Sequence, residues 1–126
     1  MTIWILLALL VYYAGVFLPS LFLIPRIGLG RYLGSRDGDP EPGKMASRAK
    51  RAHGNLHENL APFLVLGVLA MIVPDTDMAA ALLGAKVFVI ARAVYLPLYF
   101  LAVPLVRSAA FLAGLVGMLM MALALI

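Results

Sequence analysis

The sequence predicts an all-α integral membrane protein, a four-helix bundle built from a single domain. Of its 126 residues, 64% are hydrophobic and only 13% are charged, whereas soluble domains average about 45–50% apolar and about 25% charged residues. Four apolar stretches are each long enough to cross the roughly 30 Å hydrocarbon core of a bilayer as a helix. Four such helices and their connections account for residues 1–126 and leave no room for a second domain.

The first predicted helix covers about residues 2–25. Residues 1–25 carry no charge. A cleaved signal peptide would show a basic start, a shorter apolar run and a small-residue cleavage site, and none of these is present. We therefore expect a membrane-spanning helix, kinked near Pro19 and ending near Pro25.

The remaining helices follow from glycine, proline and charge. Residues 26–47 are rich in all three, which predicts a loop outside the lipid, followed by a second helix over about 46–73. An acidic turn at 74–77 precedes a third helix over about 78–101. Pro104 predicts a short connection over 102–107, and the fourth helix covers about 108–126. Small residues four apart in that last helix, such as Ala110 and Gly114, favour close helix contact.

The basic residues predict the orientation in the membrane. Seven lie between the first two apolar stretches, none lies in the 74–77 turn, and Arg107 lies in the last connection. Cytoplasmic loops are enriched in lysine and arginine. We expect both basic connections to be cytoplasmic and both termini to lie on the opposite side. The seven residues are Arg26, Arg31, Arg36, Lys44, Arg48, Lys50 and Arg51.

Polar side chains form one stripe along the first half of the second helix. A helix turns about 100° per residue, which places four of them within about 80° of one another: Arg48, Arg51, Asn55 and Glu58. The arginines alone would fit an interface with their heads in water. Glu58 lies about 10 Å deeper than Arg51, where a carboxylate is costly unless it is paired or faces a wet cavity. We predict a functional site, with a structural Arg–Glu pair as the alternative.

The third helix carries a matching group of Arg92, Tyr95 and Tyr99. A cation beside two phenols suits an anionic or peptide-like ligand, although the tyrosines could instead form an interfacial aromatic belt. Together the two stripes offer cationic forks for carboxylates, one carboxylate for an amine, and amide and phenol groups for peptide bonds. That inventory fits a small zwitterionic peptide beside a lipophilic second substrate from the bilayer.

Other chemistries are disfavoured. The chain has no cysteine, which excludes disulfides, zinc–thiolate sites and a cysteine nucleophile. The histidine pair His53 and His57 could chelate a metal at i, i+4 spacing, but no third ligand is evident, so packing or hydrogen bonding to a neighbouring helix is expected. Nucleic-acid binding would need a basic surface on a soluble fold, which is not evident. Lys86 has no clear role.

The sequence "RAKRAHGNLHENLAPF", followed by "ARAVYLPLY" and "VPLVRSAAF", resembles the MAPEG family, membrane-associated proteins in eicosanoid and glutathione metabolism. The resemblance implies a homotrimer that binds glutathione as co-substrate near the cytosolic side. It implies that Arg107 stabilises the glutathione thiolate, which attacks a lipophilic electrophile or reduces a hydroperoxide. It also implies seven ligand-binding residues: Arg48, Arg51, Asn55, Glu58, Arg92, Tyr95 and Tyr99.

The compact chain and its uninterrupted first helix resemble a bacterial inner-membrane member of that family. Some positions depart from the family's pattern, among them Ser47, where catalytic members often have an acidic residue, and Phe111, where some have a tyrosine. A non-catalytic member that binds lipid or a partner protein is therefore an alternative. A small proton-coupled exporter is a weaker one, because its carboxylate would be expected on the first helix.

Overall fold

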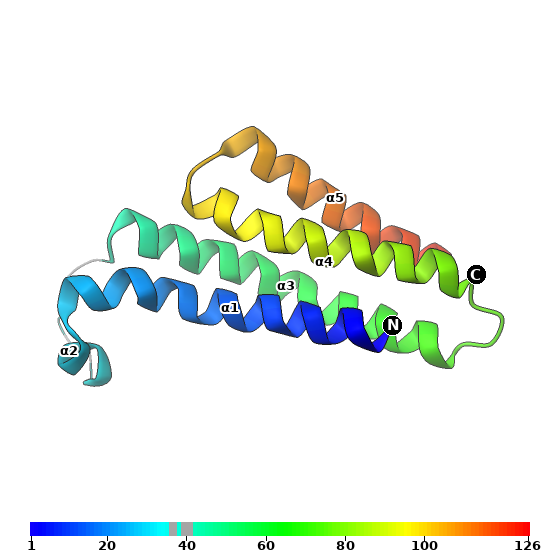
Figure 1. Ribbon diagram of the computed structural model, residues 1–126, viewed down its shortest axis with the longest axis horizontal. Coiled ribbons are helices and arrows are strands. Elements are labelled where there is room, and N and C mark those ends of the chain that lie inside the picture. Colours follow the sequence, from blue (N-terminus) through cyan, green and yellow to red (C-terminus); the bar gives the residue numbers. More distant parts are fainter. Residues whose placement is uncertain (36–37, 39–41) are drawn as a thin grey trace.

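The computed structural model describes residues 1–35, 38 and 42–126, and every regular element in them is a helix (Figure 1). The four long helices are α1 (Thr2–Ile27), α3 (Lys44–Ile72), α4 (Met78–Phe100) and α5 (Pro104–Leu123). A short helix, α2 (Leu29–Leu33), follows α1. Each long helix is long and apolar enough to cross a membrane. The predicted all-α four-helix fold is confirmed.

Two boundaries differ from the sequence prediction for a physical reason. The last helix begins at Pro104, where a connection was expected, so Arg107 and Ser108 lie within its first turn and a half. Proline is well suited to the first helical position, because its missing N–H has no intrahelical partner there anyway. In the segment predicted as a loop, α2 forms directly after Gly28, whose φ of 81° ends α1.

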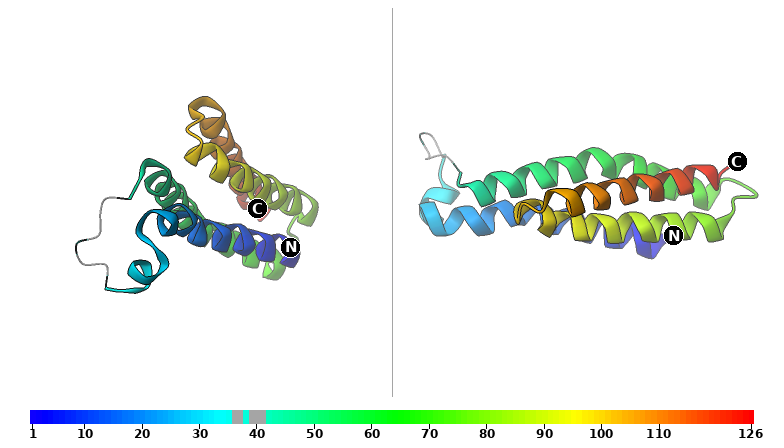
Figure 2. Two further views of the ribbon diagram at one scale, coloured as in Figure 1. Left: turned by 60° about the vertical axis from the view of Figure 1, so that its left-hand side comes forward. Right: turned by 90° about the horizontal axis from the view of Figure 1, so that it is seen from above.

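The helices are arranged as two antiparallel pairs, α1 with α3 and α4 with α5 (Figures 1 and 2). The chain termini and the α3–α4 turn lie at one end, which we call the closed end. There the backbone N–H of Asp77 donates to the carbonyl of Ala124 at 2.9 Å. At the other end, which holds the α4–α5 connection, the two pairs diverge (Figure 1). We call this the open end.

Packing between the pairs is centred on two aromatic rings. Phe63 of α3 and Phe88 of α4 are fully buried and stacked, with ring centroids 4.3 Å apart. Within the second pair, α4 and α5 cross at Gly84 and Gly117, so closely that a Cβ at either would lie within 2.6 Å of the other's carbonyl oxygen. The predicted close contact of small residues on the last helix is present, and it stiffens the α4–α5 pair.

Candidate functional site

A cavity of about 390 Å³ lies between α3 and α4 toward the open end. A second cavity of about 250 Å³ adjoins it and extends to α5. The two share Asn55, Tyr95 and Tyr99. The α3–α4 cavity is also lined by Arg51, Gly54 and Glu58, and the α4–α5 cavity by Arg107, Ser108 and Phe111.

The α3 wall follows directly from helix geometry. Helix α3 runs without a break from Lys44 to Ile72, so Arg51, Asn55 and Glu58 recur at i, i+4 and i+7 on one face. Arg51 and Glu58 are exposed and Asn55 is half-buried. No ion pair joins Glu58 to a cation in the part of the chain that the structure describes. The charges of this wall are therefore available to a ligand, and the structural Arg–Glu pair is not formed there.

Arg92 lies behind this wall rather than in it. Its side chain is completely buried, and its Nη1 donates to Asn55 Oδ1 at 2.8 Å. The guanidinium packs between the Phe88 and Phe111 rings, 5.4 and 5.0 Å from their centroids. A Cβ added at Gly114 would lie 3.2 Å from its Nε. Arg92 lines neither cavity, because these contacts enclose it, and it reaches the site through the Asn55 amide.

The α4 wall is aromatic. Tyr95 is buried and Tyr99 is half-buried, and their ring centroids lie 5.5 Å apart. Tyr95 also approaches the Phe111 ring on α5, at 6.3 Å. Both tyrosines line both cavities. This placement goes beyond what an interfacial aromatic belt would require, since the rings point into the bundle rather than outward to lipid.

Arg107 enters the α4–α5 cavity from the start of α5. Its guanidinium carbon lies 4.5 Å from the centroid of the Tyr99 ring, a cation–π contact that orients the charge without neutralising it. No ion pair or hydrogen bond joins that guanidinium to the described residues. The neighbouring hydroxyl of Ser108 donates to the Pro104 carbonyl at 3.0 Å. Arg107 is thus a positioned cation with free N–H donors.

Arg48 contacts the end of α4 and lines neither cavity. It lies on the predicted stripe one turn before Arg51. Its Nη1 donates to the backbone carbonyl of Phe100 at 3.5 Å, at the last residue of α4. Cations stabilise helix C-termini, where carbonyl groups lack intrahelical partners. The geometry gives Arg48 a bridging position between α3 and α4.

The two histidines face α1, as predicted. Tyr12 of α1 hydrogen-bonds His57 Nδ1 through its hydroxyl at 3.3 Å, and its ring centroid lies 4.9 Å from that of His53. The expected packing onto a neighbouring helix is therefore confirmed. Among residues 1–35, 38 and 42–126, no three His, Asp or Glu side chains are grouped as a metal site would need.

Among the described residues that line the two cavities, the predicted site residues did not include Ser108, Phe111 and Gly54. Of these, Gly54 is the one that belongs to the α3 wall. It lies beside the polar stripe on α3, and a Cβ added there would meet nothing within 4 Å. A helical glycine costs about 0.5–1 kcal/mol relative to alanine, and here the adjoining space belongs to the cavity. A glycine adjacent to a polar stripe in a membrane helix was the feature of the sequence that could have indicated this lining residue.

Comparison with known proteins gives one match. The model of the MAPEG family matches residues 1–126, the full length given. No curated protein and no solved structure gave a match to the chain. The match covers the four apolar helices and every residue of the two cavities. The chain therefore belongs to the MAPEG family and is an integral membrane protein.

Proposed function

We propose that the protein is a glutathione-dependent transferase or peroxidase that acts on a lipophilic electrophile or hydroperoxide. Membership of the MAPEG family supports a glutathione-related transferase or peroxidase, or a related membrane protein, at the family level. The observation that carries the finer proposal is the pair of adjoining cavities, which joins the charged α3 wall to Arg107 through shared tyrosines.

Glutathione is a tripeptide with two carboxylates, one amine, two peptide groups and a thiol. In the proposed complex Arg51 binds a carboxylate through its guanidinium fork, and Glu58 binds the amine. The amide of Asn55 and the hydroxyls of Tyr95 and Tyr99 bind the peptide groups. Arg92 takes part by holding Asn55 rather than by touching the ligand.

In the proposed reaction Arg107 activates the thiol of glutathione. A guanidinium beside a thiol favours the thiolate, which is the nucleophile. In the transferase reaction the sulfur forms a bond to the electrophilic carbon, and the thiol proton leaves with the displaced group or goes to the adduct. In the peroxidase reaction two glutathione molecules become a disulfide while the hydroperoxide becomes an alcohol and water. The exposed side chains of Leu105 and Val106 beside Arg107 offer a lipid-facing route for the second substrate.

The proposal places the site at the cytoplasmic face of a bacterial inner membrane, in a homotrimer. The basic residues Arg26, Arg31, Lys44 and Lys50 lie at the open end of the bundle, together with Arg107. Basic residues mark cytoplasmic loops. A soluble tripeptide from the cytosol would then meet a lipid-soluble substrate where the two helix pairs diverge.

The decisive experiment measures glutathione binding and thiolate formation together. Detergent-purified protein is titrated with glutathione by calorimetry, and the thiolate is followed by its ultraviolet absorbance. We expect binding in the wild type and in Arg107→Ala, with thiolate formation in the wild type alone. Lys86→Gln, which removes one charge from the exposed face of α4 outside both cavities, is the matched control and should behave as the wild type.

Each other outcome has a defined meaning. Binding without a thiolate in the wild type would make the protein a non-catalytic member that holds glutathione. An absence of binding would overturn both the proposed ligand and the proposed reaction. Equal thiolate formation in wild type and Arg107→Ala would refute the role of Arg107 but leave the proposed ligand in place.

A further inference from the structure

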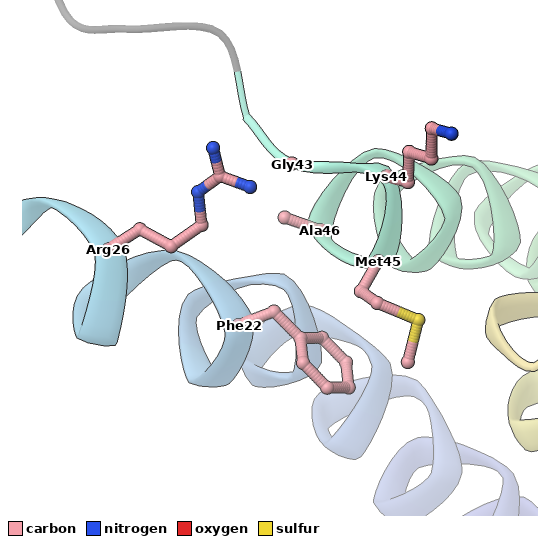
Figure 3. Close-up of a pocket in the computed structure, with 6 residues that line it drawn as sticks. All are labelled: Phe22, Arg26, Gly43, Lys44, Met45 and Ala46. Carbon is pink, nitrogen blue, oxygen red and sulfur yellow. The ribbon is translucent and has the colours of Figure 1, made fainter.

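A cavity of about 490 Å³ lies outside the proposed glutathione site, between the last turns of α1 and the first turn of α3. Six of the described residues line it (Figure 3). None of them lines the α3–α4 or α4–α5 cavity. They are Phe22, Arg26, Gly43, Lys44, Met45 and Ala46. We call this the α1–α3 hollow.

The polar side of the hollow is cationic. Arg26 and Lys44 are both exposed, and none of the described residues that line the hollow is acidic. Neither cation forms an ion pair or a side-chain hydrogen bond with the residues that the structure describes. Helix α3 also begins here without a side-chain cap, so the positive end of its dipole adds to the same field. Two cations that line the same hollow, with no anionic partner among the described residues, favour the binding of an anion.

Gly43 allows Arg26 to reach this position. A Cβ built on Gly43 would collide with Arg26 Nη1, and the guanidinium extends toward this glycine in Figure 3. The backbone of Gly43, with φ of −60° and ψ of 166°, is open to any residue. The absence of a side chain is therefore needed for the approach of the guanidinium and not for the turn itself.

The other side of the hollow is apolar. Phe22 lies one turn deeper along α1 than Arg26, and Met45 faces it from α3 (Figure 3). Both side chains are half-buried, and next to Phe22 the side chain of Leu21 is 65% exposed. Because α1 and α3 are membrane-spanning helices, their adjoining ends lie near the boundary between hydrocarbon and headgroups. The hollow thus combines cations at headgroup level with an apolar wall directed into the bilayer.

We propose that the α1–α3 hollow binds an anionic phospholipid, with its phosphate on Arg26 and Lys44 and the start of an acyl chain against Phe22 and Met45. Basic pockets between membrane helices bind lipid headgroups by the same combination of forces. A guanidinium matches two phosphate oxygens at once, while the apolar wall favours a lipid over a soluble phosphate. This site is independent of glutathione.

The test compares lipid binding by the whole protein in detergent. Native mass spectrometry counts bound phosphatidylglycerol and phosphatidylcholine, and thermal unfolding with each lipid gives a second readout. We expect the wild type to prefer phosphatidylglycerol over phosphatidylcholine. The preference should fall roughly fivefold in Arg26→Gln, and roughly fivefold in Lys44→Gln, which is about the contribution of one basic residue near an anionic headgroup. Arg51→Gln is the matched control, because it removes one charge from the same end of α3 but from the α3–α4 cavity, which shares no lining residue with the hollow.

A charge-neutral variant separates a shaped site from a general attraction. Gly43→Ala should reduce the preference by less than Arg26→Gln, because the methyl group shifts the guanidinium but leaves its charge in place. Combining the two should cause no loss beyond that of Arg26→Gln, since the methyl group acts through the guanidinium. An equal loss in Arg51→Gln would show diffuse surface attraction and overturn the site. Glycerol phosphate, which carries the headgroup charge without acyl chains, is added in a parallel thermal-unfolding experiment. If it raises the unfolding temperature as much as phosphatidylglycerol does, the ligand is a soluble phosphate and the lipid proposal is overturned. The absence of any preference would overturn the proposal.

Discussion

Arg92 on α4 donates a hydrogen bond to the side-chain oxygen of Asn55 on α3 across 2.8 Å, with no part of Arg92 exposed. The bond determines which end of the Asn55 amide faces the cavities. Since the side-chain oxygen accepts from Arg92, the NH₂ group of Asn55 remains as a donor for the ligand. One buried cation thereby orients a group that lines both cavities.

The first prediction separates this positioning role from a purely structural one. Arg92→Met keeps the volume of the side chain and removes the donor. Arg92 has no anionic partner among the described residues, and its buried Nε and Nη2 have no acceptor there. Removing the charge therefore relieves an uncompensated burial, so the unfolding temperature should change little. Glutathione binding should weaken roughly tenfold, about the contribution of one hydrogen bond to the ligand, because the Asn55 amide is no longer oriented.

Calorimetry and thermal unfolding of the same samples check this prediction. Arg48→Met is the matched control, because Arg48 also joins α3 to α4 but lines neither cavity, and its binding should equal that of the wild type. Weakened stability with unchanged binding in Arg92→Met would show that Arg92 is structural only.

The second prediction concerns Glu58 and the amine of glutathione. Glu58→Gln should weaken glutathione binding about tenfold, since a charge-assisted hydrogen bond becomes a neutral one. A glutathione analogue without the α-amine should bind wild type and variant equally. Competition binding with both ligands measures the difference. Equal weakening for the two ligands would mean that Glu58 does not contact the amine.

The third prediction concerns the platform under Arg107. The guanidinium carbon lies 4.5 Å from the Tyr99 ring centroid, a contact worth about 0.5–1 kcal/mol. Tyr99→Phe keeps the ring and should retain the thiolate absorbance of bound glutathione. Tyr99→Ala removes the ring and should reduce that absorbance a few-fold at saturating glutathione. An equal reduction in the two variants would assign the effect to the hydroxyl.

The fourth prediction concerns two glycines with opposite surroundings. An alanine Cβ at Gly117 would lie 2.6 Å from the Gly84 carbonyl and 2.8 Å from the Phe88 nitrogen, so Gly117→Ala should destabilise the fold by about 1–3 kcal/mol. At Gly54 the added Cβ meets nothing within 4 Å, so Gly54→Ala should stabilise by about 0.5–1 kcal/mol. Thermal unfolding in detergent measures both, and a similar change in the two variants would contradict the packing.

Local geometry made much of this protein predictable. The charge-free first helix and the single stripe of Arg51, Asn55 and Glu58 depend only on helix length and on 3.6-residue periodicity. The enclosure of Arg92 could not be predicted, because it depends on Gly114 and Phe111 of a helix that packs against α4.

Two further differences have local causes that the sequence left ambiguous. Pro104 can interrupt a helix or begin one, and only the packing of α5 against α4 selects the second role. Arg48 shares the stripe of Arg51, but its reach to the Phe100 carbonyl depends on where α4 ends. The sequence therefore predicted the residues that line the cavities better than it predicted the contacts of Arg92 and Arg48, which line neither.

The stacked rings of Phe63 and Phe88 are one of several contacts that join the two helix pairs. Toward the open end, Leu56 of α3 packs in one buried cluster with Tyr95 and Leu96 of α4, and Arg92 bonds Asn55 across the same interface. The α3 and α4 walls of the cavities are therefore held in place before any ligand arrives. Such pre-organisation lowers the cost of ordering the site on binding.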